Sequence, residues 1–172
     1  MKKQNYIKLS MISIFLMIMM YAEKSESQIQ SMAGPRIGVT FLGAGWTADI
    51  LTGEEDGPST FTTQYGWQWE SRFASGSNIT GLVEWVLVVG GMEHGKFLPS
   101  INSIVGFRNS EGIEMGMGPS LSLGGLGMVF AFGKTIKSGE LNIPINLVVS
   151  PPKEESGLAI SILVGFNMGK KK

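Results

Sequence analysis

Hydrophobic and polar side chains alternate in short segments along most of this 172-residue chain. The segment at 61–73 is the clearest, since one of its faces carries Phe61, Thr63, Tyr65, Trp67, Trp69, Ser71 and Phe73. A period of two predicts β-strands rather than helices. Eight such segments are expected, at roughly 35–44, 61–73, 79–90, 97–108, 112–121, 125–136, 140–150 and 156–168.

Turn-forming residues separate the segments. Glycine, serine, asparagine and proline gather at 75–78, 109–112, 138–140 and 150–152. Such short links make each neighbouring pair an antiparallel hairpin. An even number of antiparallel strands predicts an all-β fold, an eight-stranded antiparallel up-and-down β-barrel. Pro144 interrupts the seventh segment, so we expect either a bulge there or a strand that starts after it.

Periodicity alone does not say which face of the barrel is outside. A soluble lipocalin-like barrel would turn its aromatic face inward, and its other face would need many charges. That other face holds mostly small or uncharged residues and six charged ones: Arg36, Glu70, Arg72, Glu84, Arg108 and Glu114. This composition suits a narrow lumen and favours a transmembrane barrel with its aromatic face toward lipid.

The six charges balance as three arginines and three glutamates. Buried charges must be paired to be tolerated. We therefore predict an Arg–Glu network that plugs the lower lumen, and we expect loss of either Arg72 or Glu70 to destabilise the barrel. The alternative is a set of rim charges in contact with water.

Aromatic residues also recur near the C-terminal ends of the even-numbered segments. With a periplasmic N-terminus, these ends lie at the lower, periplasmic end of the barrel. The aromatic residues are Phe73, Phe107, Phe132 and Phe166, and they are expected to form a girdle at one membrane boundary. The longest link, about 44–60, would lie on the extracellular side. Its candidate contact residues are Trp46, Asp49, Glu54, Glu55 and Asp56.

The N-terminus has the layout of a secretory signal peptide. Lys2, Lys3 and Lys8 precede and border an apolar run at 9–22, which is shorter than the roughly 20 residues of a membrane-spanning helix. A small-x-small pattern at 25–27 precedes Gln28. We expect residues 1–27 to be cleaved, leaving an outer-membrane barrel domain at 28–172.

The exported part resembles the small outer-membrane β-barrel proteins of Gram-negative bacteria, most of them uncharacterised. The resemblance lies in the signal peptide, in GIEMGMGP at 112–119, in LNIPIN at 141–146 and in the closing strand GLAISILVGFN at 157–167. It implies insertion by the barrel-assembly machinery and contact with outer-membrane lipid. The family often ends on its aromatic residue, whereas six residues follow Phe166 here.

Composition excludes several kinds of chemistry. The formal net charge is zero, so no basic field collects nucleic acid. There is no cysteine and a single histidine, so no thiolate or histidine-rich metal site is expected. The run Gly43-Ala44-Gly45-Trp46-Thr47-Ala48 fits G-x-G-x-x-A, but no crossover helix follows to hold a dinucleotide. We expect no cofactor and no metal, because the acidic residues at 54–56 lack the spacing of a calcium loop.

These observations predict a non-enzymatic structural or surface-interaction protein of the outer membrane, with an unknown external partner. One alternative is a soluble secreted or periplasmic β-barrel that binds an apolar ligand. A narrow channel and a lipid-modifying enzyme are less favoured. The enzyme would use His94 together with Asp49, Asp56, Ser59, Ser120 or Ser122, whose spacing fixes no triad.

Overall fold

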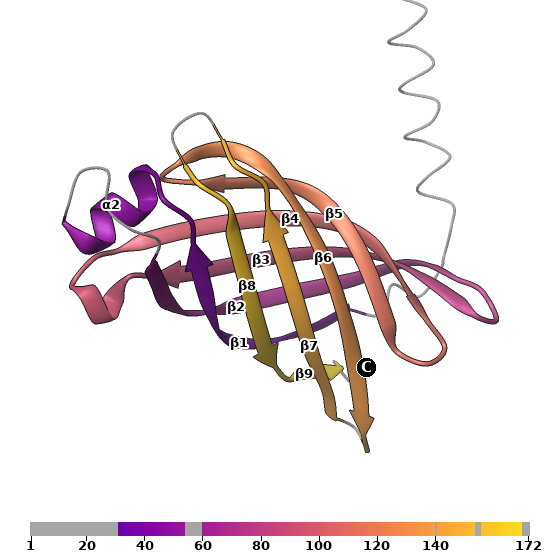
Figure 1. Ribbon diagram of the computed structural model, residues 1–172. Coiled ribbons are helices and arrows are strands. Elements are labelled where there is room, and N and C mark those ends of the chain that lie inside the picture. The colour runs from indigo at the N-terminus through magenta and orange to yellow at the C-terminus, as the bar shows by residue number, and fades with distance from the viewer. Residues whose placement is uncertain (1–30, 54–59, 140, 154–155, 170–172) are drawn as a thin grey trace, which may run out of the picture.

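The computed structural model describes residues 31–53, 60–139, 141–153 and 156–169 (Figure 1). The expected signal peptide and Glu54, Glu55, Asp56 and Ser59 lie outside these residues. The strands are β1 (Ser31–Leu42), β2 (Thr60–Ser75), β3 (Ile79–Gly90), β4 (Leu98–Asn109), β5 (Ile113–Ser122), β6 (Gly125–Ser138), β7 (Leu141–Ser150), β8 (Ala159–Gly165) and β9 (Asn167–Gly169). A helix α2 (Trp46–Thr52) and a 3₁₀ turn η1 (Met92–His94) join them.

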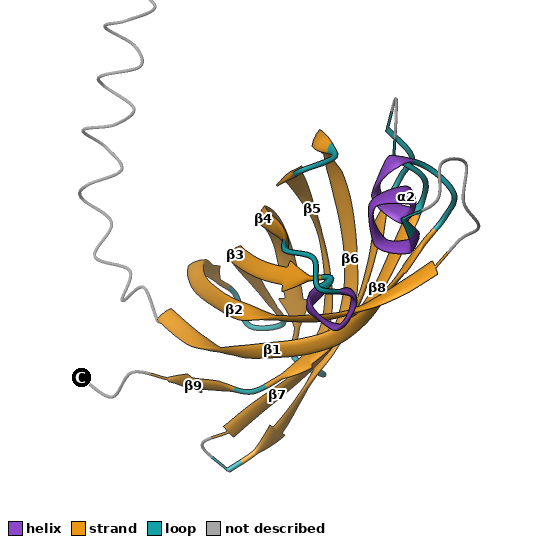
Figure 2. Cartoon of the chain, turned by 90° about the vertical axis from the view of Figure 1, so that its left-hand side faces the viewer, coloured by secondary structure: helices purple, strands orange, loops and turns teal. Residues whose placement is uncertain are grey.

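The strands form a closed antiparallel barrel, as the sequence predicted. Each strand pairs with its neighbours in chain order, and β1 pairs with both β2 and β8. A row of paired residues that leaves Ser31 and passes through β2 to β8 returns to β1 at Phe41, ten residues further on (41 − 31). This stagger tilts the strands around the barrel, as Figures 1 and 2 show.

The closing strand is interrupted at Phe166. Strands β8 and β9 pair with the same two neighbours, β1 and β7, in the same register, so together they are the eighth strand of the barrel. Pairing to β1 stops after Arg36 opposite Gly165 and resumes at Ala33 opposite Met168. Two prolines flank this gap, Pro35 on β1 and Pro144 on β7.

Pro144 corrects the expectation from the sequence. It lies inside an unbroken β7, opposite Thr135 of β6, and the β6–β7 register shows no bulge. Both expected outcomes, a bulge at Pro144 and a strand that starts after it, are therefore wrong. A residue in an antiparallel ladder directs its N–H toward one neighbour only, so the missing donor disturbs one side. The disturbed side is that of β8, where pairing skips from Ile145 to Asn142.

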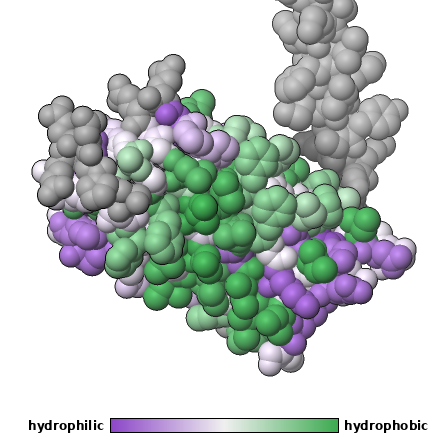
Figure 3. All heavy atoms as spheres, in the orientation of Figure 1, coloured by the Kyte–Doolittle hydropathy of each residue, from purple (hydrophilic) through white to green (hydrophobic). Residues whose placement is uncertain are grey.

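The outer face of the barrel is apolar, whereas the lumen holds the buried charged and polar residues together with an apolar cluster. Large side chains such as Trp69, Trp85 and Phe132 point outward and are 47%, 50% and 43% exposed. Hydrophobic residues gather over the strands in Figure 3, and hydrophilic ones gather toward their ends. The aromatic face therefore does not line the lumen, as the soluble alternative would require.

Part of the expected long link is helical. Helix α2 begins after Gly45 and ends at Thr52, followed by Gly53, whose left-handed backbone (φ 74°) favours glycine. Ala48 and Leu51 are buried against Leu42, with Leu98 of β4 and Ala159 of β8 packed on the same cluster. Because β4 lies across the barrel from β8, the helix covers part of one mouth (Figure 2).

Candidate functional site: the barrel lumen

The lower lumen is built around Arg108 of β4. Its terminal nitrogens donate to the two carboxylate oxygens of Glu70 on β2, at 2.8 and 2.7 Å. Its Nε donates to Glu114, which lies directly opposite on β5. All three side chains are buried. One guanidinium thus joins three strands through charge-assisted hydrogen bonds.

Arg72 lies at the margin of this cluster. Its Nε is 3.3 Å from Glu70 Oε1, and its side chain is 22% exposed. Its Nη2 also donates to the sulfur of Met32, at 3.5 Å. Arg72 therefore pairs with Glu70, but with more solvent around it than Arg108 has.

Arg36 and Glu84 are joined through an amide. Arg36 Nε donates to Gln68 Oε1 at 2.8 Å, and Gln68 Nε2 donates to Glu84 Oε1 at 2.7 Å. Arg36 Nη2 also donates to Asn167 Oδ1 of β9 at 2.7 Å, and Nη1 donates to the carbonyl of Pro35. Among the residues that the structure describes, no cationic nitrogen forms an ion pair with Glu84.

All six charged residues singled out from the sequence therefore face the lumen, and hydrogen bonds bring them into two groups. One group is Glu70, Arg72, Arg108 and Glu114, and the other joins Arg36 to Glu84. Gln68 and Asn167 complete these groups and were missed, because a count of charges does not find neutral amides. A signal existed for Gln68, which shares the lumen face of its strand with Glu70.

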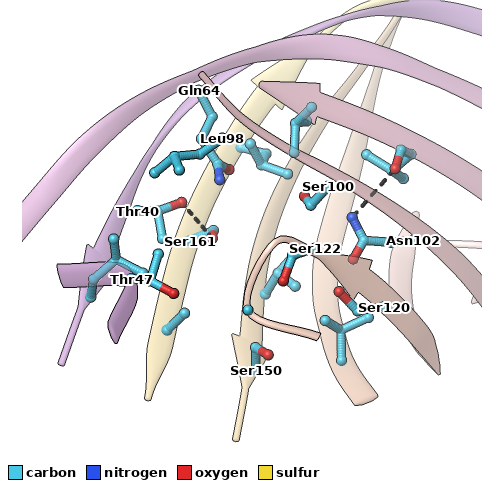
Figure 4. Close-up of a pocket in the computed structure, with 18 of the residues that line it drawn as sticks. Thr40, Thr47, Gln64, Leu98, Ser100, Asn102, Ser120, Ser122, Ser150 and Ser161 are labelled. Carbon is cyan, nitrogen blue, oxygen red and sulfur yellow. Dashed lines mark hydrogen bonds between the residues drawn. The ribbon is translucent and has the colours of Figure 1, made fainter. Parts of the chain in front are cut away.

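The upper lumen holds a cavity of about 140 Å³. Figure 4 shows its polar wall, in which Thr40 and Ser161 share a hydrogen bond of 2.7 Å and Asn102 donates to the backbone of Val86. Another part of the wall is apolar. It is formed by a cluster of Val86, Val88, Ile104, Val129 and Ala131, with Val148 packed on it. Glu84, Gln68 and Asn146 line the same cavity and connect it with the charged groups below.

The four expected girdle residues lie on the outer face, with exposed fractions between 41% and 53%. Phe107 and Phe132 flank Met115 on one paired row. That row reaches β8 at Ile162, not at Phe166. Rows also climb with the stagger of the barrel, so a common level for the four rings stays a prediction.

Of the candidate contact residues, Trp46 and Asp49 belong to α2, and Trp46 is 37% exposed. His94 lies in η1, where its Nε2 is 3.4 Å from the carbonyl oxygen of Phe61 and 3.9 Å from Glu93. No hydrogen bond joins it to a serine among the described residues. The contacts of His94 therefore do not make a triad there.

Glu93 joins the same turn to the start of β2. Its carboxylate accepts hydrogen bonds from the backbone N–H and the hydroxyl of Thr63. Desolvation raises the pKa of Glu93. These bonds, with others from its own backbone and Thr62, lower the pKa by more than desolvation raises it, so it falls to about 2.

Two negative findings concern the described residues. No group of three or more histidine, cysteine, aspartate or glutamate side chains is placed to hold a metal ion within them. No helix in that part of the chain is long and apolar enough to cross a membrane.

Fold and lumen together define a closed eight-stranded antiparallel β-barrel with an apolar exterior. The solved structure of Ail, the attachment invasion locus protein of Yersinia pestis, is similar at 12% identity, covering 83% of this chain and 100% of that one, with a TM-score of 0.29. The same protein in complex with the heparin analogue sucrose octasulfate matches at 13% identity, with the same coverage and a TM-score of 0.30. No family model and no curated protein matches the chain. Similarity this low transfers no activity, ligand or partner.

Proposed function

We propose that this protein is an outer-membrane β-barrel of a Gram-negative cell, exported through a cleaved signal peptide at 1–27. The observation that carries the proposal is the outward apolar face of a closed barrel. In water, a belt of exposed side chains such as Trp85 and Phe107 would drive association. In a bilayer it meets hydrocarbon, and closure leaves no unpaired strand edge along most of the barrel.

Cell fractionation tests this placement. Full-length protein should sediment with the outer membrane and should migrate differently on a gel when unboiled and when boiled. A matched chain that lacks residues 1–27 should stay in the cytoplasm and show no such shift. Recovery of the full-length protein in the periplasm or medium, with no heat-dependent shift, would overturn the proposal.

The role we propose is non-enzymatic. Eight strands leave an interior just wide enough for side chains, and buried ion pairs of Arg108 cross the lower part of this lumen. We therefore expect no ion conductance from the purified protein in a planar bilayer. The conductance of the wild-type protein is compared with that of a variant with both Arg108→Ser and Glu70→Ser, which lacks the central ion pair. Steady conductance by the wild-type protein would favour the narrow channel instead.

The surface element we propose is α2 with the rest of the link 44–60, presented to the cell exterior. The absence of cysteine allows a direct test. Trp46→Cys should react with a membrane-impermeant maleimide on intact cells, and Ser110→Cys, in the β4–β5 turn at the other end of the barrel, should not. Labelling of Ser110→Cys alone would show that the barrel has the opposite orientation in the membrane, with α2 away from the cell exterior.

Outer-membrane lipid and the barrel-assembly machinery are the partners we propose, the latter reading the closing strand at 157–167. The lipid-modifying alternative depends on His94. We expect His94→Ala to leave the lipid profile of expressing cells unchanged, because its contacts in the structure are a backbone carbonyl and Glu93. A changed profile would restore the enzyme interpretation.

A further inference from the structure

The cavity in the upper lumen has an unsatisfied floor. Asn146 lines the cavity, and its buried Oδ1 has no hydrogen-bond partner in the described structure. The residue is 7% exposed. A buried acceptor without a partner costs about 1–3 kcal/mol, so it is a place where a donor would be bound favourably.

Glu84 provides a second acceptor at the same floor. It is 6% exposed and lines the cavity, and the contact shown for its carboxylate is the amide of Gln68. A carboxylate offers about four lone-pair sites, so one amide leaves most of them unused. The other two lumen glutamates, Glu70 and Glu114, instead pair directly with Arg108.

Several polar groups in the walls above this floor already have partners. Thr40 and Ser161 bond to each other, Asn102 bonds to the backbone of Val86, and Thr62 bonds to the carbonyl of Thr63. At the mouth, Lys153 Nζ already donates to the carbonyl of Gly125 and to Ser122. Between floor and mouth lies the apolar cluster around Val86 and Val129.

We propose that the upper lumen is a binding site for a small organic ammonium ion with a compact apolar body. Its ammonium group donates to Glu84 and Asn146 at the floor, and its hydrocarbon part lies against the Val86–Val129 cluster. Buried carboxylates are stabilised by paired cations, which an ammonium ion supplies and an alcohol does not. A cavity of about 150 Å³ accommodates benzene in another protein, so the 140 Å³ here fits a body of similar size.

The lumen would bind this ligand whether or not the barrel lies in a membrane. The mouth offers the route of access, where α2 and the β7–β8 connection meet through a hydrogen bond of 3.1 Å between Thr47 and Ser156. Both residues line the cavity.

Binding can be measured on the full mature chain in lipid nanodiscs, which avoids detergent in the cavity. The probe is benzylammonium, and benzyl alcohol and benzoate are the matched uncharged and anionic compounds. NMR titration should show saturable shifts of the Val86 and Asn146 amides with benzylammonium at millimolar concentrations. Benzyl alcohol and benzoate should bind at least roughly tenfold more weakly.

Three variants test whether benzylammonium binds at the floor and the apolar wall of this cavity. Glu84→Gln keeps the size of the side chain and should weaken benzylammonium binding by roughly tenfold or more. Ala131→Phe should abolish binding by filling the cavity. Glu114→Gln, also a lumen glutamate but outside this cavity, should bind as the wild type does. The heat-dependent gel shift verifies that each variant is folded.

Several results would overturn the assignment. One is the absence of saturable binding to the wild type. Another is equal affinity for the alcohol or the carboxylate, which would make the site a neutral or anionic one. Unchanged affinity in Glu84→Gln, or in Ala131→Phe if Glu84→Gln does not fold, would show that the probe binds elsewhere. None of these results depends on which membrane holds the barrel.

Discussion

Arg108 and Glu70 form a two-pronged ion pair across the lumen, with both Nη atoms of the arginine on both oxygens of the glutamate. The two residues lie on β4 and β2, which are not neighbours in the barrel. The pair therefore ties together strands that share no backbone hydrogen bonds. Its loss should weaken the barrel as a whole more than it weakens any one hairpin.

Glu70→Ala should destabilise the barrel by about 3 kcal/mol, because it leaves Arg108 and Arg72 short of a buried partner. Arg72→Ala should cost about 1 kcal/mol or less, since its side chain is 22% exposed and its contact with Glu70 is 3.3 Å. Urea unfolding in lipid vesicles, followed by tryptophan fluorescence, measures both. Equal midpoints for Glu70→Ala and wild type would show that the network does not stabilise the fold.

Gly34→Ala should prevent closure of the barrel. A Cβ at this position would overlap the backbone carbonyl of Phe166 at the interrupted strand. We expect little of this variant to show the heat-dependent gel shift after refolding. Gly90→Ala is the control, since its Cβ would meet its nearest neighbours at 3.4 Å, an ordinary contact. Normal refolding of Gly34→Ala would mean that β1 and the closing strand can separate at this point without loss of the barrel.

The contact between Glu93 and Thr63 should persist in acid. The folded pKa of Glu93, about 2, is lower than its value of roughly 4.3 in an unfolded chain, so this contact stabilises the fold fully above pH 4.3. The stabilisation is lost as the pH falls through the folded pKa. NMR titration of the Thr63 amide should give a midpoint near pH 2, and Thr63→Val, without the hydroxyl donor, should raise it. A wild-type midpoint near 4.3 would contradict the observed hydrogen bonds.

Leu51→Ala should loosen α2 from the barrel mouth. Leu51 is buried with Ala48 and Leu42, and truncation of a buried leucine typically costs about 2–5 kcal/mol. Hydrogen exchange should become faster across Trp46–Thr52 while the barrel strands remain protected. Trp46→Ala removes a side chain that is 37% exposed and should change exchange much less. Equal effects of the two variants would show that α2 is held by something other than this cluster.

Tryptophan depth can be read with brominated lipids. A variant that keeps Trp85 alone should be strongly quenched by bromine on the acyl chains, because this side chain is 50% exposed on the outer face. A variant that keeps Trp46 alone, in α2, should be quenched weakly. Similar quenching of both would place the outer face of β3 outside the hydrocarbon.

The strand pattern was predictable because each strand has two different faces. The expected segments at 79–90 and 125–136 agree with β3 and with most of β6. The first strand starts earlier than expected, at Ser31 rather than 35, because small residues such as Ala33 and Gly34 carry a weak alternating signal. Backbone pairing with β2 includes the described residues from Ser31 onward, and pairing with β9 includes Met32 and Ala33.

Helix α2 was missed because seven residues are too few for a helical period to stand out. The signals present were Ala48 and Leu51 three positions apart and Gly53 as a terminator. The lumen charges were found because charged residues on a strand face otherwise made of small residues have few explanations. Their partners could not be assigned, since the stagger that brings Arg108 to Glu70 depends on the closure of the whole barrel.

The gap beside Phe166 changes how the two ends of the chain are joined. Where two prolines leave the backbone without donors, Arg36 bonds to Gln68 on one side and to Asn167 on the other. The last few residues of the barrel are thus held by this guanidinium in addition to a backbone ladder that is interrupted at Phe166. Because Asn167 belongs to β9, the hydrogen bonds of Arg36 to both Gln68 and Asn167 exist only in the closed barrel, where its side chain is buried.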